Sequence, residues 1–545
     1  MRLTTADPPV VSPVRPETGR ARRARTPLGL SVTSLVLGAL FAAPLLYLVV
    51  RNLGLGDEVF DVLSSDVALG PLRRTVVLAT SVALATAVLG TALAWLVMRT
   101  DLPFRRILRV LLALPLVIPS FVGALALVAA FASGGLADEI FGVDVLTRPR
   151  GFWAAFVVLT LLCYPYVYLP VAARLSALPP SLEESARSLG RSPANVFRTI
   201  VWPQSTGAVA AGALLVFLYV VSDFGAVSLV RYDTLTTRIE SSRLFDPPTA
   251  LVLGLLLAGV ALLVVVGERA VGRRRLHTEA VGAGRHAFQA RLGAWKSPAL
   301  VFTGLVVTIS LVAPLAVLGQ WAWRGVRSAR GNARVEAADF VDPALNTAGV
   351  AIVAALVAVL AVLPIAYLTT RHSSRAGGVT NALVVSGFAL PGIVIALAVA
   401  FWLLRAPLGG NLYQTFPPLI FAYVVHFGAQ ALRSSQVAVS GVPRRMDDAA
   451  RSLGASRWRR LRTVDLPLML PGLAAAAGLV LLSTMKELPA TLLLAPTGFD
   501  TLATRIWSAT ESGYFGRAGT AALVLVALSG VLTWFLTIRH MERVA

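Results

Sequence analysis

Long apolar runs alternate with short polar segments along almost the whole chain. A helix needs about 20 mostly apolar residues to cross a bilayer, and about twelve runs approach this length, six in each half of the sequence. We expect membrane-spanning helices near residues 28–50, 75–98, 107–132, 152–173, 206–229, 249–267, 299–321, 347–369, 380–404, 417–433, 469–485 and 519–538. The pattern therefore predicts an all-α polytopic membrane protein.

A polar stretch near the middle of the chain separates two similar halves. We expect a basic tail, a first membrane half, a linker and a second membrane half, at residues 1–27, 28–267, 268–298 and 299–545. Similar residues recur in the halves at an offset of 272 positions, in the pairs Thr75 and Thr347, Arg99 and Arg371, and Pro119 and Pro391. Six spans return the chain to its starting side. The halves should therefore be parallel copies about an axis normal to the membrane, with a pore between them.

Two polar segments repeat one pattern inside this apolar chain. They read Glu184-Ser-Ala-Arg-Ser-Leu-Gly190 and Asp448-Ala-Ala-Arg-Ser-Leu-Gly454, and they lie 264 positions apart. Each is followed at the same interval by a second marker, Ile200-Val-Trp-Pro203 or Val464-Asp-Leu-Pro467. Both follow the fourth predicted span of their half, so the chain should carry the same device twice on one side of the membrane.

Local signals predict a helix, a tight turn and a second helix in each polar segment. The spacing of Ser181 and Glu184 is that of a capping box, which predicts a helix start at Ser181. Gly190 then falls where a left-handed residue ends a helix, and Ser192 before a proline is a typical start for the next one. Gly454 and Ser456 repeat this order, but the second copy lacks the first serine, which leaves the start of its first helix open.

The composition supports a membrane protein and sets its orientation. Hydrophobic residues make up 56% of the chain, and the mean hydropathy is +0.74. With a cytoplasmic N-terminus, most Arg and Lys fall on cytoplasmic segments, as the positive-inside rule requires. Residues 324–334, with four Arg, are the main exception. The net charge of +21 is spread over short loops, which indicates topology and contact with anionic lipid rather than nucleic acid.

The first apolar run and the single cysteine need separate interpretations. A basic stretch before an apolar run is also typical of a signal peptide, but a run of about 23 residues is too long for a cleaved core. We therefore keep it as a span. Cys163 is the only cysteine, which excludes an intrachain disulfide, and we expect it to be a packing residue.

Two acidic residues fall within or at the end of apolar runs. Asp223 and Glu487 each follow the glycine of their polar segment by 33 positions. A carboxylate inside a membrane costs roughly 2.5–3.5 kcal/mol on insertion scales, so both should face a cavity or a partner rather than lipid. One interpretation places them beside a central pathway, where they attract a cation or close a gate. The other gives each a local partner and a structural role.

The two polar segments resemble the EAA motif of permease subunits in binding-protein-dependent ATP-binding-cassette (ABC) importers. In that family the motif forms a coupling helix that inserts into a groove on the ATPase. The residues that match are Glu184, Ala186, Gly190 and Pro203, with Asp448, Ala450, Gly454 and Pro467; Glu183 and Asp447 are adjacent candidates. Ser185, Trp202, Asp448 and Val464 depart mildly from the motif. The resemblance implies docking of two ATPase subunits, and we call residues 184–203 and 448–467 the docking segments.

Other segments resemble the fused, two-half permeases of ferric iron importers. They are Val221–Leu229, Met485–Leu493 and Thr497–Ile506. This resemblance implies a type I ABC importer permease in the bacterial inner membrane, with both termini in the cytoplasm. It would receive iron(III) from an extracytoplasmic solute-binding protein. Related permeases carry thiamine, sulfate, polyamines or phosphonates, so these cargoes remain alternatives.

The sequence offers no catalytic site, metal site or cofactor site. A phosphate-binding loop needs Gly-Lys-Ser/Thr, whereas Lys296 follows Trp295 and Lys486 follows Met485. ATP should therefore be bound by the partner ATPase. His426 alone lies in a predicted span, where packing or a hydrogen bond is the commoner role.

Two other classes of protein fit the pattern less well. A secondary transporter would share the repeats and buried acids but would not need two coupling motifs. A membrane enzyme would need a catalytic constellation at one depth. The stripe of Tyr164, Tyr166 and Tyr168 could line a pore, although packing is the favoured interpretation.

Overall fold

The computed structural model of the chain describes residues 27–141, 149–272, 290–328, 335–372, 374–388, 390–407 and 409–533. Within these ranges the regular structure is helical, apart from one bridge between Thr100 and Ala290. Nine of the described helices are long and apolar enough to cross a membrane, and the number rises to eleven if each of two bent pairs is one span. The predicted fold class, an all-α polytopic membrane protein, is confirmed.

The predicted apolar runs coincide with helices in both halves. The first half contains α1 (Leu28–Leu53), α2 (Glu58–Ser64), α3 (Asp66–Arg99), α4 (Arg105–Leu111), α5 (Ser120–Ala130), α6 (Leu136–Phe141), α7 (Gly151–Cys163), α8 (Pro165–Ala177), α9 (Pro180–Ser188), α10 (Pro193–Val196), α11 (Trp202–Ser222), α12 (Gly225–Leu229), α13 (Leu235–Phe245) and α14 (Pro247–Gly272). The second contains α15 (Lys296–Val307), α16 (Ala313–Arg327), α17 (Ala338–Arg371), α18 (Arg375–Phe388), α19 (Gly392–Arg405), α20 (Phe416–Ser440), α21 (Arg444–Ser452), α22 (Arg457–Arg460), α23 (Leu466–Met485), α24 (Pro489–Leu494), α25 (Leu502–Glu511) and α26 (Phe515–Thr533).

Several helix boundaries differ from the predicted runs, and one run is less apolar than the rest. Helices α3 and α17 begin nine residues before the runs predicted at 75–98 and 347–369, and α11 ends at Ser222, inside the run predicted at 206–229. Helix α14 continues to Gly272, past the predicted start of the linker. Helix α20, which holds the run predicted at 417–433, is not among the nine apolar spans because His426, Gln430 and Arg433 lower its hydropathy. Residues 534–538 of the last predicted span lie outside the described residues.

Prolines divide the third predicted run of each half into two half-helices. The chain bends by 92° between Arg105–Val117 and Ser120–Ala130, and by 98° between Arg375–Gly387 and Gly392–Arg405. Pro119 and Pro391 are the N-caps of α5 and α19. A residue before proline avoids the helical conformation, and Ile118 is accordingly extended. Both bends place the start of a buried helix, α5 or α19, inside the molecule.

Prolines also explain three π-helical turns. These are η2 (Phe197–Val201), η4 (Thr308–Val312) and η7 (Leu461–Asp465). Each leads into a helix with proline near its first residue, at Pro203, Pro314 or Pro467. Proline cannot donate the backbone hydrogen bond of a regular helix, so a wider turn satisfies the carbonyl groups before it. The proline of each docking segment therefore marks a defined widening of the helix that enters the membrane region.

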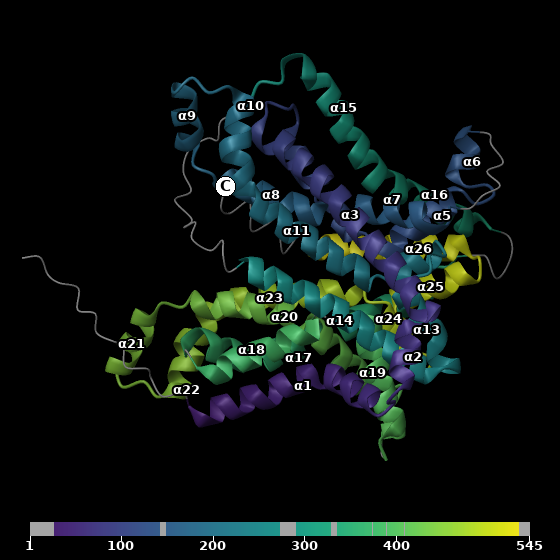
Figure 1. The fold of residues 1–545 in the computed structure, drawn as a ribbon, viewed down its shortest axis with the longest axis vertical. Helices are drawn as coiled ribbons and strands as arrows, with labels where there is room; N and C mark the ends of the chain where they lie inside the picture. The colour runs from purple at the N-terminus through teal and green to yellow at the C-terminus, as the bar shows by residue number, and fades with distance from the viewer. Residues whose placement is uncertain are drawn as a thin grey trace, which may run out of the picture.

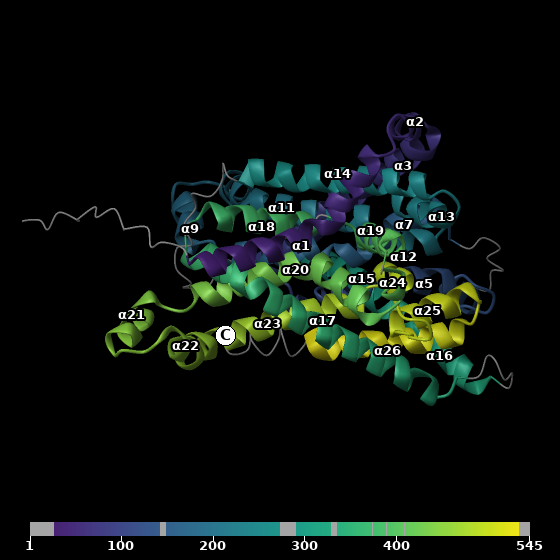
Figure 2. The same ribbon diagram turned by 90° about the horizontal axis from the view of Figure 1, so that it is seen from below.

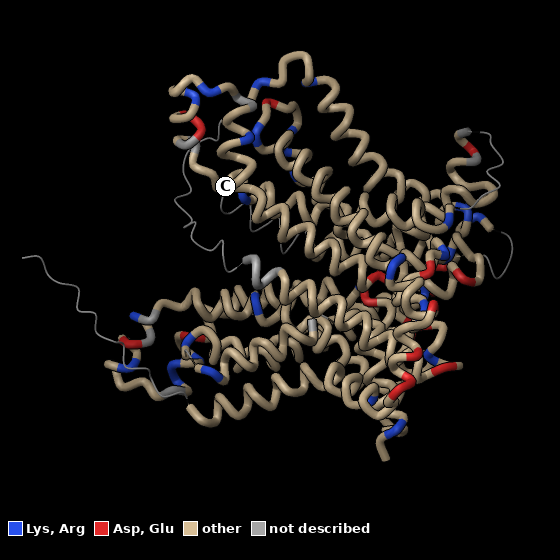
Figure 3. The backbone as a smooth tube through the Cα atoms, viewed as in Figure 1, with Lys and Arg blue, Asp and Glu red and all other residues tan. Residues whose placement is uncertain are grey.

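The two docking segments lie at the same end of the molecule. Figure 1 and Figure 2 show α9 and α21 at one end, with α13 and α25 at the other. In Figure 1 one group of helices includes α3, α8 and α9, and the other includes α17, α20 and α21. The two groups lie apart at the α9/α21 end and meet toward the α13/α25 end. Charged residues gather at both ends, and the middle of the helices is almost free of them (Figure 3). The parallel relation of the halves, predicted from six spans per half, agrees with this arrangement.

The first helix of each half packs on the opposite half. Helix α1 contacts α17, α18, α19 and α20, whereas η4 and α16 contact α7 and α5. Trp321 of α16 donates its indole N–H to the Ala129 carbonyl at 3.0 Å, and Arg324 pairs with Glu139. The membrane halves are therefore interlocked.

Gly428 of α20 allows α1 to pack closely on the second half. A Cβ atom at this position would lie 2.1 Å from Cε1 of Phe41, a buried residue of α1. We expect Gly428→Leu to destabilise the protein by about 1–3 kcal/mol through overpacking, and Phe41→Ala to restore part of the loss. Thermal unfolding in detergent measures both effects. Gly349→Leu on α17 is the control, since nothing lies within 4 Å of its Cβ position; an equal loss there would contradict the interpretation.

The described end of the linker is tied to α3. The backbone N–H of Ala290 donates to the Arg99 carbonyl at 2.8 Å, and the Asp101 N–H donates to the Ala290 carbonyl at 3.2 Å. Lys296 Nζ lies 2.8 Å from Asp101 Oδ2, and this hydrogen bond lowers the pKa of the Asp101 carboxyl. The second half thus begins against the end of α3 that also faces α9.

Candidate functional site

Both docking segments begin their first helix at equivalent positions. Helix α9 starts at Pro180 after Pro179, and α21 starts at Arg444 after Pro443. The capping box predicted at Ser181 and Glu184 is wrong, because no side chain caps α9 and the helix starts one residue earlier. Pro180, the first residue of α9, has the φ angle of a helix and no N–H to satisfy, which favours a helix start at this position.

The turn after each first helix has the predicted left-handed glycine. Gly190 has φ +79° and Gly454 has φ +76°. The N–H groups of Gly190 and Arg191 donate to the carbonyls of Arg187 and Ala186 at 2.8 and 3.2 Å. The second copy repeats these bonds at 2.9 and 3.0 Å, from Gly454 to Arg451 and from Ala455 to Ala450. Both turns are Schellman motifs, which only a residue tolerant of positive φ can form without strain.

The second helix of each docking segment starts at the predicted serine. Ser192 Oγ accepts the Asn195 N–H, and Ser456 Oγ accepts the Arg459 N–H, each at 3.4 Å. The two segments therefore share the same helix start, turn and restart, although their sequences differ at several positions. Such a unit can be displaced as a rigid body.

The docking segments expose a short apolar and polar edge. Leu189 is 81% exposed and Leu453 is 87% exposed, next to the open positions Gly190 and Gly454. The predicted contact residues Glu184 and Asp448 are also exposed. Ala186 is buried and Ala450 is half-buried, so they pack inward. Pro203 and Pro467 are exposed on α11 and α23.

Glu183 turns away from this exposed edge. Its carboxylate lies 2.6 Å from Nη1 of Arg99, and both residues are almost fully buried. Burial raises the pKa of the Glu183 carboxyl, and the positive charge of Arg99 limits the rise. The side chain of Asp447, the equivalent residue, lies outside the described part of the structure. Glu183 is thus placed to brace α9 against α3.

Arg99 and Arg371 occupy equivalent positions in the two halves, and their structural roles were not predicted from the sequence. Arg99 donates to the Leu175 carbonyl at 2.7 Å, while Arg371 donates to the Val439 and Val442 carbonyls at 3.1 and 2.9 Å. Both arginines thus hold the chain that leads into a docking segment. The sequence signal that could have revealed this role is an arginine at the end of an apolar run in both halves.

A cavity of about 360 Å³ lies between the two halves. Its lining includes both acids that the sequence singled out, Asp223 and Glu487. It also includes Cys163, Tyr166, His426 and Lys486. The structure therefore brings together the two predicted path residues, which are 264 positions apart in the chain.

Both carboxylate oxygens of Asp223 accept hydrogen bonds from nearby groups. Its carboxylate accepts the Ser120 hydroxyl at 2.5 Å and the N–H groups of Ala226 and Val227 at 3.0 and 3.2 Å. The residue ends α11 and precedes α12, and it is 7% exposed. Ser120 is the first residue of α5, so the carboxylate also lies near the positive end of that helix.

Glu487 has a similar position in the second half and looser partners. Its Oε1 accepts the Ala490 N–H at 3.1 Å, and its Oε2 lies 3.8 Å from Nε2 of His426. A Cβ atom on Gly392, the first residue of α19, would lie 2.5 Å from Oε1. Both acids therefore adjoin the start of a half-helix. They have local hydrogen-bond partners, and both line the cavity.

The cavity wall differs between the two halves. Residues related by 264 positions are Leu162 and His426, Tyr166 and Gln430, Tyr219 and Ser483, and Ser222 and Lys486. In three of these pairs an apolar or aromatic side chain of the first half corresponds to a polar one of the second, and in the fourth a serine corresponds to a lysine. Lys486 also crosses between the halves, because its Nζ donates to the Leu116 carbonyl at 2.8 Å.

The other residues named from the sequence are divided between the cavity and the core. Tyr164 and Tyr168 are buried in packing, whereas Tyr166 lines the cavity. His426, for which packing or a hydrogen bond was expected, packs against Phe427 and lies with Nε2 3.8 Å from Glu487 Oε2. Among the described residues, no group of three His, Cys, Asp or Glu side chains could hold a metal ion. A cation in this cavity would meet two carboxylates without a closed ligand shell.

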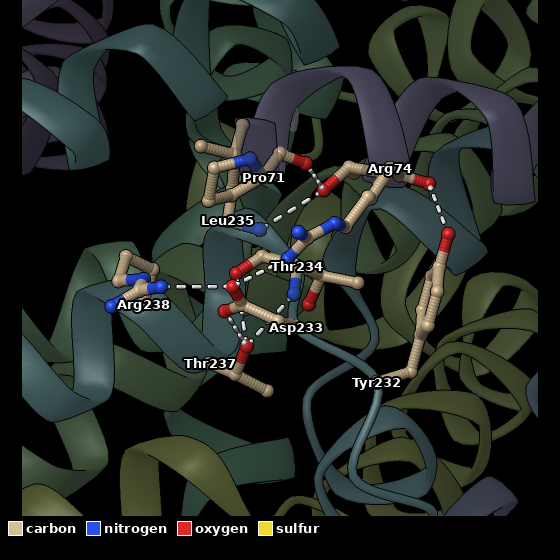
Figure 4. Close-up of polar contacts among 9 residues, drawn as sticks. Pro71, Arg74, Tyr232, Asp233, Thr234, Leu235, Thr237 and Arg238 are labelled. Carbon is tan, nitrogen blue, oxygen red and sulfur yellow. Dashed lines mark hydrogen bonds and ion pairs between the residues drawn. The ribbon is translucent and has the colours of Figure 1, made fainter. Parts of the chain in front are cut away.

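A third repeat lies at the α13/α25 end, and only its second copy was noted in the sequence. It reads Asp233-Thr-Leu-Thr-Thr-Arg238 and Asp500-Thr-Leu-Ala-Thr-Arg505. Thr234 and Thr501 form capping boxes with the threonines three residues later. The repeated letters, 267 positions apart, would have revealed the first copy. Figure 4 shows this first copy beside Arg74 of α3.

Comparison with known proteins gives matches along both halves. Residues 86–277 and 362–543 match the family described as Binding-protein-dependent transport system inner membrane component. The Fe(3+)-transport system permease protein FbpB 2 of Haemophilus influenzae is 30% identical over 518 residues, which is 94% of this chain and 98% of the relative. The sulfate transport system permease protein CysT of Synechocystis sp. is 26% identical over 43% of this chain and 85% of the relative.

Proposed function

We propose that this chain, which belongs to the family of binding-protein-dependent transport system inner membrane components, carries iron(III) through the membrane. The chain is the multi-pass permease of an ABC importer. The family works with an ABC ATPase and an extracytoplasmic binding protein, and its members are transport subunits rather than enzymes. The substrate, the orientation, the ATPase stoichiometry and the residue roles are the proposed parts.

The proposal that the cargo is iron(III) rests on one main observation. The iron permease relative is 30% identical and matches 94% of this chain, whereas the shorter sulfate permease relative is 26% identical and matches 43% of this chain and 85% of its own length. The shared region therefore includes both halves and both cavity walls. Two carboxylates in one cavity also suit a hard, highly charged cation, since carboxylate oxygen is a ligand typical of hard metal ions.

The docking segments support the proposed energy source and orientation. Their exposed edges lie at one end of the molecule, so two ATPase subunits, one at each segment, can act on the halves together. We place this end in the cytoplasm, where ATP is available, with both termini on the same side. Glu184, Gly190, Asp448 and Gly454 are the proposed contact residues, and Glu183 supports α9 from within.

The cavity supports the proposed path. Cargo released at the α13/α25 end would reach Asp223 and Glu487 where the two halves meet. Both carboxylates already accept hydrogen bonds from backbone N–H groups, so they are oriented before a cation arrives. Few rearrangements are needed to attract the cation, and the absence of a closed ligand shell allows it to leave.

Lys486 favours a second candidate, an anionic cargo such as sulfate. Its ammonium group lies in the cavity wall, and a sulfate permease is among the relatives. The charges of the wall decide between the candidates. Two acids and one lysine favour a cation, unless the lysine alone contacts the cargo.

Uptake by whole cells tests the proposed cargo. We expect deletion of the chain to abolish uptake of radiolabelled iron(III) and the intact chain to restore it, with sulfate and thiamine uptake unchanged. Lys486→Met should retain iron uptake, because it removes a positive charge from a cation path. Unchanged iron uptake after deletion, with sulfate uptake lost and dependent on Lys486, would replace iron(III) with the anion.

A further inference from the structure

Helix α3 is fixed to the first docking segment at one end. Arg99, its last residue, pairs with Glu183 of α9 at 2.6 Å and donates to the Leu175 carbonyl of α8 at 2.7 Å. Arg99 is 3% exposed and Glu183 is 6% exposed. A buried charge pair holds its geometry because separation leaves both charges without compensation. A displacement of α9 therefore has to move the end of α3 with it.

The other end of α3 is fixed to α13. Thr75 Oγ1 donates to the Pro71 carbonyl at 2.8 Å and accepts the Leu235 N–H at 2.9 Å. Beside it, Arg74 lies 2.7 Å from Asp233, and the Tyr232 hydroxyl donates to the Arg74 carbonyl at 3.4 Å. Figure 4 shows these bonds joining α3 to the start of α13. The first N–H of α13 is thus satisfied by a side chain of α3.

The stretch of α3 between these contacts is an unbroken helix. No proline interrupts it from Thr75 to Arg99, and at 1.5 Å per residue it spans about 36 Å. Gly90 lets it lie against α8, because a Cβ atom there would approach the Tyr164 carbonyl to 2.9 Å. Such a helix transmits a displacement along its axis with little loss.

The second half has related connections on α17, through Arg371 at one end and Thr347 toward the other. Arg371 holds the carbonyls of Val439 and Val442 just before α21. Thr347 donates to the Pro343 carbonyl at 2.6 Å and accepts the Leu502 N–H of α25 at 2.8 Å. Pro364 lies within this stretch, so α3 is the more regular of the two helices. Because the arginine contact and the threonine contact both occur in each half, we infer that they serve a common role.

Helices α13 and α25 in turn contact the wall of the cavity. Thr236 of α13 donates to the backbone carbonyl of Asp223 at 2.7 Å. Trp507 of α25 packs on Phe224, with 5.3 Å between ring centroids. Phe224 belongs to the first half, so the contact of Trp507 also crosses between the halves. A movement of either helix therefore reaches a residue that lines the cavity.

We propose that α3 and α17 are transmission rods, in which Arg99 with Glu183 and Thr75 with the Leu235 N–H couple ATPase docking to α13 and to the cavity wall. Arg371 and Thr347 serve the second half. This inference rests on the proposed function, because it requires a motor at α9 and α21. The residues are positioning residues and contact neither ATP nor cargo.

The contacts of the transmission rods near α13 and α25 can be tested by measuring how strongly the loaded binding protein stimulates the ATPase. We expect Thr75→Val combined with Thr347→Val to reduce this stimulation by about fivefold or more, in the range typical of coupling between sites, with basal hydrolysis retained. Thr75→Ser with Thr347→Ser keeps the acceptors and should retain it. The matched control is Thr86→Val, since Thr86 is buried on α3 and bonds only within its own helix, to the Ala83 carbonyl. Full stimulation in the valine pair, or an equal loss in the control, would overturn the proposal.

Distances between spin labels test the same idea without replacing Arg99, Thr75 or Thr347. Ser185 on α9, Ser241 on α13 and Ser452 on α21 are exposed labelling sites. Through the ATP cycle of the complete complex, the distance from Ser185 to Ser241 should stay constant while the distance from Ser185 to Ser452 changes. A change between Ser185 and Ser241, or no change in either distance, would overturn the rods. A complex stimulated by a sulfate-loaded instead of an iron(III)-loaded binding protein would overturn the cargo alone.

Discussion

Replacing Gly190 and Gly454 together with tryptophan is expected to reduce ATP-driven uptake to background while the protein remains in the membrane. Both glycines have positive φ angles of +79° and +76°, and nothing lies within 4 Å of either Cβ position. A non-glycine residue in this conformation costs roughly 1–2 kcal/mol, too little to unfold a protein of this size. The indole rings would instead occupy the surface at which we propose that the ATPase docks.

The matched control places the same change outside the proposed docking segments. Gly56 and Gly151 also have positive φ angles and open Cβ positions, so Gly56→Trp with Gly151→Trp carries the same backbone strain. We expect this control to transport normally and the docking pair to lose both uptake and ATPase stimulation. Alanine at Gly190 and Gly454 should give an intermediate loss, because it adds strain without bulk. Normal uptake in the tryptophan pair would contradict the docking role.

Removing the charges of the two cavity carboxylates, Asp223 and Glu487, is the second change with a large expected effect. At an effective dielectric constant of about 20, two unit charges about 8 Å apart interact with an energy on the order of 2 kcal/mol. An energy of this size changes a rate or an affinity by about thirtyfold. We expect Asp223→Asn with Glu487→Gln to lower iron(III) uptake by about thirtyfold or more. Initial uptake rates in cells with equal amounts of permease give the measurement.

The hydrogen bonds of the two acids indicate that these variants fold. Asparagine can still accept the N–H groups of Ala226 and Val227, and glutamine can still accept the Ala490 N–H. Asp339→Asn, on α17 outside the cavity lining, is the control for loss of a carboxylate. Retained uptake in the double variant, with wild-type protein levels, would show that the carboxylates have structural roles only.

The features predicted well from the sequence depend on short-range rules or on duplication. The left-handed turns at Gly190 and Gly454 follow from helix-ending chemistry that a few residues determine. The apolar runs predict spans because a bilayer requires helices of defined length. The meeting of Asp223 and Glu487 in one cavity agrees with their common register, since parallel halves place equivalent residues on opposite sides of one axis.

The features that were missed depend on contacts between distant segments. Nothing near Glu183 in the sequence indicates that Arg99 neutralises it, and the packing of α1 on the second half involves residues several hundred positions apart. The capping box failed for a local reason, because Pro180 begins the helix before Ser181 can cap it. The repeat at Asp233 and Asp500 was visible in the sequence, and its role became clear only through the bonds to Thr75 and Thr347.

The most direct test of the proposed function is iron(III) accumulation in proteoliposomes that contain the permease, its ATPase and an iron-loaded binding protein. ATP should drive accumulation in the wild-type complex, whereas the Gly190→Trp and Gly454→Trp pair should hydrolyse ATP at the basal rate without accumulating iron. Accumulation driven by an ion gradient without ATP, or unaffected by the tryptophan pair, would contradict a permease coupled to its motor through α9 and α21.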